Sequence, residues 1–600
     1  MDVSQQKPVA TVAVPRLNHL CNTCSSYFPS DKPWPWLVER IDVGDGVLLW
    51  KFSIMQLVDS AATECHLCTL LLKALLPERT LIGIKEQPQD QYWMRKTMYQ
   101  IQMLPDSLDV LVGGFVLRIK IDTENPENAK DLHFKPVRPS VDDNSNQRSW
   151  TLLEPIFGTH IDVVQTRSST NINPPAIQQI KNWLRTCTEE HDTCRGSDSA
   201  TSFPQDSTFR LVDIGVHTDD PVRLVDVDNS LGTSQMKYIT LSYRWTDKIK
   251  RTSLNAGVKD QFYRSIQTDA WPQIYRDAVL VARQLGIRYL WIDSLCIVQG
   301  QKEDWKGQAA LMDKIYGCGF LNLAGVEGER SLGLEVTRNP LRVAPCLFTL
   351  TRPGREPPLS TIQNWLCYRP DDIRKAVDRA PLYDRGWTFQ ERVLSKRTVH
   401  FGDQLFWECT CLRASETFPL GVDFTNHPES LDDAIKRIRE TLQQPSTSMS
   451  SDSNDWNNRK VPDIFPLSPT SPAAAGLHRL WCTVVRYYSS ARLTEASDRL
   501  EALKGITNSL ARRYGLSETD YTAGLWKPLL PLQLLWAREK GVSCFREDRE
   551  DECRLPKHFP SWSWASCPGE AHFVQLDTGF VRSFIRLDDV QAFDNTGRTN

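Results

Sequence analysis

Apolar and polar residues alternate most clearly in the middle of the chain, over residues 238–245 (YITLSYRW). This segment is rich in β-branched and aromatic residues, which favour strands. One face of the predicted strand carries the apolar side chains of Ile239, Leu241, Tyr243 and Trp245. The opposite face carries Thr240, Ser242 and Arg244. We therefore expect a strand with one apolar and one polar face.

A repeating order of helix and strand follows this segment. Residues 272–285 carry apolar side chains at helical spacing and end before Gly286, which stands where a helix cap belongs. The short apolar run 287–292 (IRYLWI) predicts a strand covered on both faces. A second helix over 305–316 and a further strand over 320–324 complete a pattern typical of a parallel α/β sheet with right-handed crossovers. Ligands of such sheets bind at the carboxyl ends of the strands.

Changes in composition divide the chain into four parts. We expect an N-terminal cysteine-rich region at 1–208, a parallel-sheet core at 209–413, a partly disordered linker at 414–476 and a C-terminal α+β region at 477–600. The linker is predicted because Ser, Thr, Pro and Asn displace apolar residues there.

Charge and hydropathy exclude several classes of protein. The 71 Lys and Arg residues nearly balance the 74 Asp and Glu residues, and the net charge of −3 offers no basic footprint for nucleic acid. We read no signal peptide and no apolar run long enough to span a membrane, so we expect a cytoplasmic protein with reduced thiols. The sequence motifs of P-loop enzymes, zinc proteases, α/β-hydrolases and kinases are absent.

Cysteines near the N-terminus have the spacing of metal ligands. Cys21 and Cys24 form one CxxC pair, and Cys65 and Cys68 form a second. Two such pairs can hold a structural zinc ion in a tetrahedral site. The alternative is that small buried thiols simply pack in a core.

A third cluster has the spacing CxxxHxxC. Its residues are Cys187, His191 and Cys194, and they follow Trp183 on a predicted helix. This cluster offers three further ligands for zinc, with packing in a core again the alternative.

Two residues with reactive side chains follow the predicted strand 287–292. Asp293 closes the strand and either caps the next loop or faces a ligand. Cys296 lies between apolar neighbours, so it is either an inert core thiol or a nucleophile, which would need a base such as His400.

Glu391 lies on an apolar stripe of a predicted helix. Trp387, Glu391 and Leu394 are spaced to share one face of this helix. A carboxylate in such surroundings needs a partner or has a raised pKa. Glu391 therefore either pairs with an arginine such as Arg385 or serves as a ligand-facing or catalytic acid.

These segments, taken in order, resemble the fungal heterokaryon incompatibility (HET) domain family. The resemblance rests on YITLSYRW (238–245), WPQIYRDAV (271–279), LGIRYLWIDSLCIVQ (285–299), RGWTFQERVLSKRTVHF (385–401) and LFWEC (405–409). Flanking elements such as CHLC (65–68) and PSWSWAS (560–566) extend it from about Cys21 to Ser566. The chain departs from the family pattern at Thr246, where Gly is usual, and at Gln308, where Glu is common.

The resemblance implies a role in non-self recognition and programmed cell death. Such a protein would act through self-association or protein partners, with no nucleic acid and no membrane span involved. HET domains are also distantly similar in fold to TIR domains, some of which cleave NAD, so the alternative is an NAD glycohydrolase. In that alternative, Glu391 and then Asp293 are the candidate catalytic carboxylates. Its candidate ligand-binding residues are Ser242, Arg244, Gln299 and Arg385.

Overall fold

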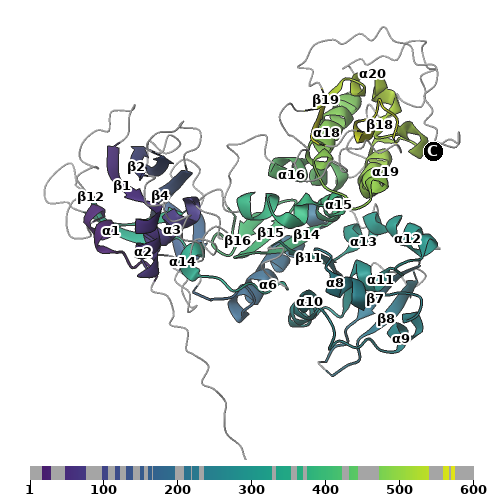
Figure 1. The fold of residues 1–600 in the computed structure, drawn as a ribbon, viewed down its shortest axis with the longest axis horizontal. Coiled ribbons are helices and arrows are strands. Elements are labelled where there is room, and N and C mark those ends of the chain that lie inside the picture. Colours follow the sequence, from purple (N-terminus) through teal and green to yellow (C-terminus); the bar gives the residue numbers. More distant parts are fainter. Residues whose placement is uncertain are drawn as a thin grey trace, which may run out of the picture. The chain divides into compact units, whose positions relative to one another are not determined.

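The computed structural model places residues of the chain in two compact units. The described residues are 17–28, 47–75, 98–105, 115–121, 130–139, 149–153, 160–164, 167–195, 208–217, 219–228, 236–326, 333–352, 361–368, 374–421, 431–443, 472–538, 559–566 and 569–573. The first unit combines the segments Met1–Asn173, Thr337–Ile373 and Ala414–Phe424. The second combines Pro174–Val336, Arg374–Arg413 and Thr425–Asn600. Each unit is therefore assembled from stretches that lie far apart in the sequence (Figure 1).

The first unit contains an antiparallel sheet with short helices. Its strands are β1 (Val47–Ser53), β2 (Met98–Pro105), β3 (Phe115–Ile121), β4 (Lys130–Pro139), β5 (Ser149–Leu153), β6 (His160–Val164), β12 (Cys346–Arg352) and β13 (Thr361–Tyr368). They pair in the order β1-β2-β3-β4-β13-β12, with β5 joining β4 to β6. The helices are α1 (Asn22–Tyr27), α2 (Ile54–Ala62), α3 (His66–Leu75) and α14 (Pro340–Val343). Strands β12 and β13 come from a distant part of the sequence, and they belong to this sheet because β13 pairs with β4.

The second unit is built on a mixed sheet. Its strands are β7 (Thr208–Asp213), β8 (Arg223–Asp228), β9 (Tyr238–Ser242), β10 (Tyr289–Trp291), β11 (Leu321–Gly325), β14 (Arg397–Phe401) and β15 (Leu405–Cys409). The sheet also includes β16 (Arg413–Ser415), at the sequence boundary between the two units. The strand order is β16-β15-β14-β11-β9-β10-β7-β8. The four central strands β10, β9, β11 and β14 are parallel, whereas β7, β8 and β15 pair antiparallel to their neighbours. The expected parallel α/β sheet is thus present as the centre of a larger mixed sheet.

Helices of the second unit connect and cover these strands. They are α6 (Pro174–Glu189), α7 (Asp192–Arg195), α8 (Asp247–Thr252), α9 (Lys259–Arg264), α10 (Gln273–Gln284), α11 (Asp293–Cys296), α12 (Lys302–Ala309), α13 (Met312–Cys318), α15 (Gly386–Leu394), α16 (Leu431–Gln443), α18 (Pro472–Ser489), α19 (Lys504–Tyr514) and α20 (Leu530–Gln533). Gly286 has φ +73° directly after α10, as expected for a glycine that caps a helix.

Two predicted elements differ from the observed ones. Strand β9 ends at Ser242, three residues before the predicted end, and both of its faces are buried. The helix predicted over 305–316 is two helices, α12 and α13. The aromatic side chains that suggested one helix have different partners, because Trp305 packs against Trp387 and Tyr316 against Trp291.

Strand β15 is covered on both faces. Its Trp407 stacks on Trp183 of α6, with ring centroids 5.9 Å apart, and both rings are buried. The next residue, Glu408, pairs with Arg392 of α15 and Arg439 of α16. Successive side chains of a strand point to opposite faces. Helix α6 therefore covers one face of β15, and α15 and α16 cover the other, as Figure 1 shows.

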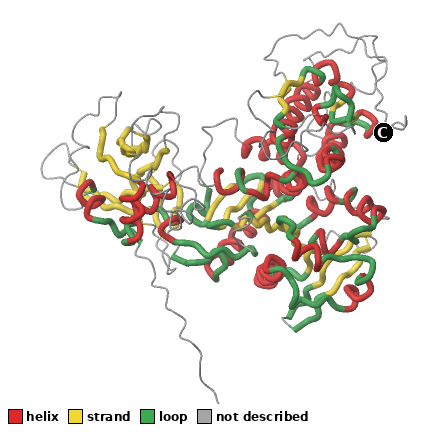
Figure 2. The backbone as a smooth tube through the Cα atoms, in the orientation of Figure 1, coloured by secondary structure: helices red, strands yellow, loops and turns green. Residues whose placement is uncertain are grey.

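The C-terminal part of the second unit is mainly helical (Figure 2). Helices α18 and α19 pack around buried tryptophans, among them Trp481, Trp526 and Trp564. Two small antiparallel pairs complete it: β17 (Tyr521–Thr522) with β18 (Leu525–Trp526), and β19 (Trp536–Arg538) with β20 (Ala571–Phe573). Helix α16 lies within the segment 414–476. In the part of the chain that is described, no helix has the length and apolar character needed to cross a membrane.

Candidate functional site

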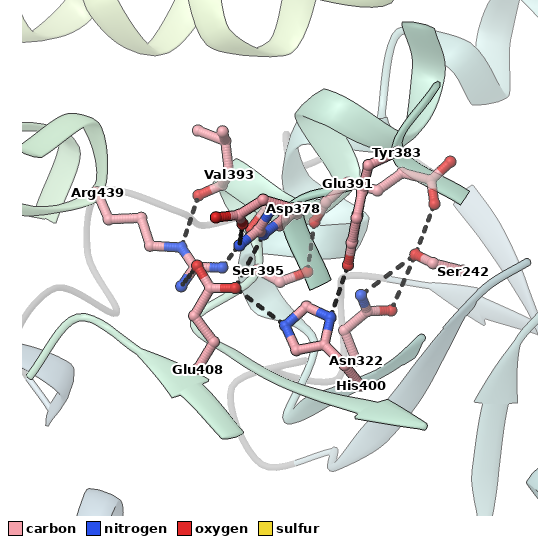
Figure 3. Close-up of polar contacts among 11 residues, drawn as sticks. Ser242, Asn322, Asp378, Tyr383, Glu391, Val393, Ser395, His400, Glu408 and Arg439 are labelled. Carbon is pink, nitrogen blue, oxygen red and sulfur yellow. Dashed lines mark hydrogen bonds and ion pairs between the residues drawn. The ribbon is translucent and has the colours of Figure 1, made fainter. Parts of the chain in front are cut away.

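A buried carboxylate and a buried hydroxyl meet at the carboxyl end of β9. Ser242, the last residue of β9, donates a hydrogen bond of 2.6 Å from Oγ to Oε2 of Glu391 on α15. Both residues are buried, with exposed fractions of 1% for Ser242 and 8% for Glu391. Figure 3 shows the Glu391 side chain reaching from α15 toward Ser242.

An asparagine on the adjacent strand holds Ser242 in place. Asn322 of β11 donates from Nδ2 to Ser242 Oγ at 3.2 Å and accepts at Oδ1 from Thr240 Oγ1 at 2.9 Å. All three residues are buried. The polar face predicted for the strand is therefore covered by protein, and its hydroxyls bond to a buried amide rather than to water.

The Glu391 carboxyl is poised between its charged and neutral forms. Burial raises its pKa from 4.5 to about 7, although the hydrogen bond from Ser242 has the opposite effect. The charge of Asp293 also raises the pKa of Glu391, and the guanidinium of Arg385 lowers it. A carboxyl with a pKa close to neutral can act as a general acid or base.

In the part of the chain that the structure describes, Glu391 and Arg385 form no ion pair. Arg385 Nη1 donates instead to the Tyr243 carbonyl oxygen at 2.8 Å. The described hydrogen bond of Glu391 comes from Ser242, so the predicted ion pair with Arg385 is not formed. Arg385 remains close enough to act on Glu391 and Asp293 through its charge.

Asp293 follows β10 and is the centre of a second cluster. Its Oδ2 accepts from the Trp245 indole N–H at 2.8 Å, and its Oδ1 accepts from the Tyr243 hydroxyl and from the Ser294 backbone N–H at 2.6 Å. Burial raises the pKa of Asp293, and the bonds from Tyr243 and Trp245 oppose that shift. Asp293 thus anchors the start of α11 and the residues after β9, and it also lies near Glu391.

The remaining candidate residues lie in different surroundings. Gln299 belongs to the loop beyond α11, where its amide donates to the Ile297 carbonyl oxygen at 3.0 Å and its backbone N–H to Leu254. Arg244 is half-buried directly after Tyr243. The structure therefore brings Ser242, Asp293, Arg385 and Glu391 together, whereas the described hydrogen bonds of Gln299 are with Ile297 and Leu254.

Cys296 has the surroundings of a core thiol. It is fully buried, and burial raises the pKa of its thiol to about 12. His400 cannot serve as its base, because its Nε2 lies 2.9 Å from Glu408 and its Nδ1 lies 2.8 Å from the Tyr383 hydroxyl. The nucleophile interpretation of Cys296 has no support in these contacts.

A buried ion network lies beside the Glu391 cluster (Figure 3). Glu408 forms ion pairs with Arg392 at 2.9 Å and with Arg439 at 3.1 Å, and Arg392 also pairs with Asp378 at 2.8 Å. Burial disfavours the charged form of Glu408, but the two arginines outweigh it and hold its pKa well below 4.5. Arg439 also donates to the Val393 and Arg392 carbonyl oxygens. The network therefore fixes the end of α15 that carries Glu391.

Four cysteines of the first unit form a group that could hold a metal ion. The sulfur atoms of Cys21, Cys24, Cys65 and Cys68 all lie within 4.8 Å of one another. Cys24 is 3.4 Å from Cys68 and 3.7 Å from Cys65, and Cys21 is 3.9 Å from Cys68. Cys21 and Cys24 lie at the start of α1, and Cys65 and Cys68 lie at the start of α3, so the starts of two helices supply the four sulfur atoms.

Comparison with known proteins identifies the region that carries the Ser242 and Glu391 cluster. Residues 238–391 match the family model of the heterokaryon incompatibility protein (HET). The chain therefore contains a HET domain over these residues. The family resemblance read from the sequence is confirmed, and the match begins at the first residue of β9 and ends at Glu391. A search of curated proteins found no match, and neither did a search of solved structures.

The sequence interpretation did not single out Asn322, Tyr243 or Tyr316 as residues of the HET domain site. Asn322 stands in a short apolar strand, where a buried amide is unusual enough to have marked it. Tyr243 and Tyr316 have the sequence patterns of ordinary core aromatics, and only the fold brings them to Asp293 and Glu391. Local pattern therefore finds the strands of the site better than its polar side chains.

Proposed function

We propose that this protein acts in non-self recognition of the heterokaryon incompatibility type and triggers programmed cell death through its HET domain. The observation that carries the proposal is the match of residues 238–391 to the HET family. The Ser242–Glu391 hydrogen bond joins the first strand of this match to its last residue. The domain acts through self-association or a protein partner.

The buried cluster suits a protein that must be silent until triggered. Glu391 and Asp293 are held near each other at a cost of desolvation, and buried charged groups of this kind are retained where function requires them. A rearrangement that opens the cluster to water would remove the burial that raises the pKa of Glu391, so its carboxyl would ionise at neutral pH.

The test is inducible expression in a fungal host, with growth followed for the wild type and for Glu391→Gln. We expect expression of the wild type to arrest growth. At equal protein levels, cultures that express Glu391→Gln should contain at least ten times as many surviving cells. The matched control is Glu303→Gln, since Glu303 is an exposed carboxylate on α12 within the same domain. If the wild type and Glu391→Gln arrest growth to the same extent, Glu391 has no role in the mechanism.

The second candidate is an NAD-cleaving enzyme, favoured by the raised pKa of Glu391 beside the strand ends. In this alternative, Glu391 interacts with the ribose hydroxyls as an oxocarbenium-like transition state forms, and Arg385 or Arg244 holds the pyrophosphate. The distant similarity of HET domains to TIR domains supports it as a fold-level analogy.

Intracellular NAD distinguishes the two candidates in the same cultures. If NAD falls before growth stops and Glu391→Gln prevents both, the enzyme is the better description. If growth stops while NAD stays constant, the protein kills through interaction. Nicotinamide release by the purified chain gives a direct assay for the enzyme.

We also propose that the first group of cysteines binds a structural zinc ion. For a tetrahedral site with zinc–sulfur bonds of about 2.3 Å, the sulfur atoms are about 3.8 Å apart. The sulfur–sulfur distances of 3.4 to 3.9 Å among Cys21, Cys24, Cys65 and Cys68 are close to that value. The ion would join α1 to α3.

A further inference from the structure

A second group of metal-ligand side chains lies in the other unit. Its members are Cys187 near the end of α6, His191 between α6 and α7, Cys194 on α7 and Cys409 at the end of β15. One ligand atom from each residue lies within 4.8 Å of the other three. The three cysteines are buried and His191 is half-buried. Three members belong to a short segment, but the fourth follows more than two hundred residues later.

The packing of α6 on β15 explains why Cys409 arrives there. Trp183 and Cys187 are four residues apart in a helix, so they lie on one face. Trp407 and Cys409 are two residues apart in a strand, so they also share a face. The stack of Trp183 on Trp407 thus brings the two cysteines to the same end of the contact.

The distances suit a tetrahedral ion. His191 Nδ1 lies 3.5 Å from Cys409 Sγ and 3.9 Å from Cys194 Sγ. With zinc–sulfur bonds of about 2.3 Å and a zinc–nitrogen bond of about 2.0 Å, tetrahedral geometry requires a nitrogen–sulfur separation of about 3.5 Å. Three cysteines and one histidine are also a donor set common in structural zinc sites.

Donors around the sulfur atoms would stabilise thiolates. Arg397 Nε donates to Cys187 Sγ at 3.2 Å, and the Leu412 backbone N–H donates to Cys409 Sγ at 3.2 Å. Three thiolates on Zn²⁺ leave a net charge of −1, and the guanidinium of Arg397 opposes it. Hydrogen bonds to the ligands of this kind are typical of metal sites. Thiols that merely pack in a core need neither a cation nor an imidazole beside them.

We propose that Cys187, His191, Cys194 and Cys409 bind a structural zinc ion. All four ligands lie outside residues 238–391, because Cys187, His191 and Cys194 precede the HET match and Cys409 follows it. The ion would fasten α6 and α7 to β15, whose Glu408 holds Arg392 next to Glu391. It would therefore support the site from outside the matched region.

The test uses the full chain purified without chelator, with zinc measured by elemental analysis. We expect Cys409→Ser to contain about one zinc ion per chain less than the wild type. The matched control is Cys411→Ser, because Cys411 is exposed and outside the ligand group although its sulfur lies 3.7 Å from that of Cys194. Equal zinc content in Cys409→Ser and the wild type overturns the proposal, whatever the first cysteine group binds.

A second measurement needs only the wild-type chain and so does not depend on the folding of a variant. A thiol-alkylating reagent is applied before and after a zinc chelator, and the labelled peptides are identified by mass spectrometry. We expect Cys187, Cys194 and Cys409 to become labelled only after chelation, whereas exposed Cys411 is labelled in both samples. If chelation leaves the labelling of these three cysteines unchanged, they do not share a metal ion.

Discussion

Ser242 and Glu391 stand 149 residues apart in the sequence and form a buried hydrogen bond of 2.6 Å. The bond joins the first strand of the HET match to its last residue. The burial of this pair can be measured even before the trigger of the protein is known, because it raises the pKa of the Glu391 carboxyl.

Glu391 should make the stability of the fold depend on pH. Its pKa is about 7 in the folded chain and 4.5 without the fold, so between these pH values the folded state keeps a proton that the unfolded state has lost. The free energy of unfolding should therefore fall as pH rises from 4.5 to 7, by about 3 kcal/mol from this group.

Denaturation of the wild type and of Glu391→Gln at pH 5 and pH 8 tests this dependence. Glutamine does not ionise, so the variant should lose less stability than the wild type over that interval. Glu303→Gln, at an exposed position, should behave as the wild type does. A wild type and Glu391→Gln with parallel pH profiles would falsify the raised pKa.

Asp293→Asn should destabilise the second unit. The aspartate accepts from the Tyr243 hydroxyl, the Trp245 indole and the Ser294 backbone N–H, whereas an asparagine has one acceptor oxygen and an amide that faces a donor. We expect a loss of about 1–3 kcal/mol in chemical denaturation. Asp269→Asn is the control, because Asp269 is exposed on the same unit, and a loss shared by both variants would argue against the anchoring role.

Arg439→Ala should be among the most destabilising changes. It removes one of the two arginines that pair with buried Glu408 and releases α16 from the Val393 carbonyl oxygen. Breaking a buried pair in this way costs about 3–5 kcal/mol. Arg437→Ala, two residues earlier on the exposed side of α16, should cost far less, and thermal melts of the two variants compare them directly.

Cys65→Ser should remove zinc from the first unit. The sulfur of Cys65 lies 3.7 Å from that of Cys24, within the group that includes Cys21 and Cys68. We expect about one zinc ion per chain to be lost and the first unit to melt at a lower temperature. Cys367→Ser is the control, since Cys367 is a buried thiol of the same unit that belongs to neither ligand group. Unchanged zinc in Cys65→Ser would leave these cysteines as core residues.

The sequence by itself determined the local elements of the HET domain. The alternation over 238–245 and the apolar spacing over 272–285 are properties of neighbouring residues, and β9 and α10 form where these patterns occur. The apolar run that became β10 indicated a parallel sheet for the same reason, because a strand covered on both faces needs an apolar sequence. The cysteine spacing likewise indicated three ligands of the second metal group from one helix and its end.

Only the tertiary structure decided which distant residues meet. The sequence did not indicate Cys409 as a metal ligand, and it reaches His191 only through the stack of Trp183 on Trp407. Asn322 became part of the site because β11 pairs beside β9. Asp293, open to two interpretations in the sequence, accepts from three donors that follow the neighbouring strands β9 and β10. Spacing along the chain cannot encode such meetings, since they depend on how whole helices and strands pack to bury their apolar faces.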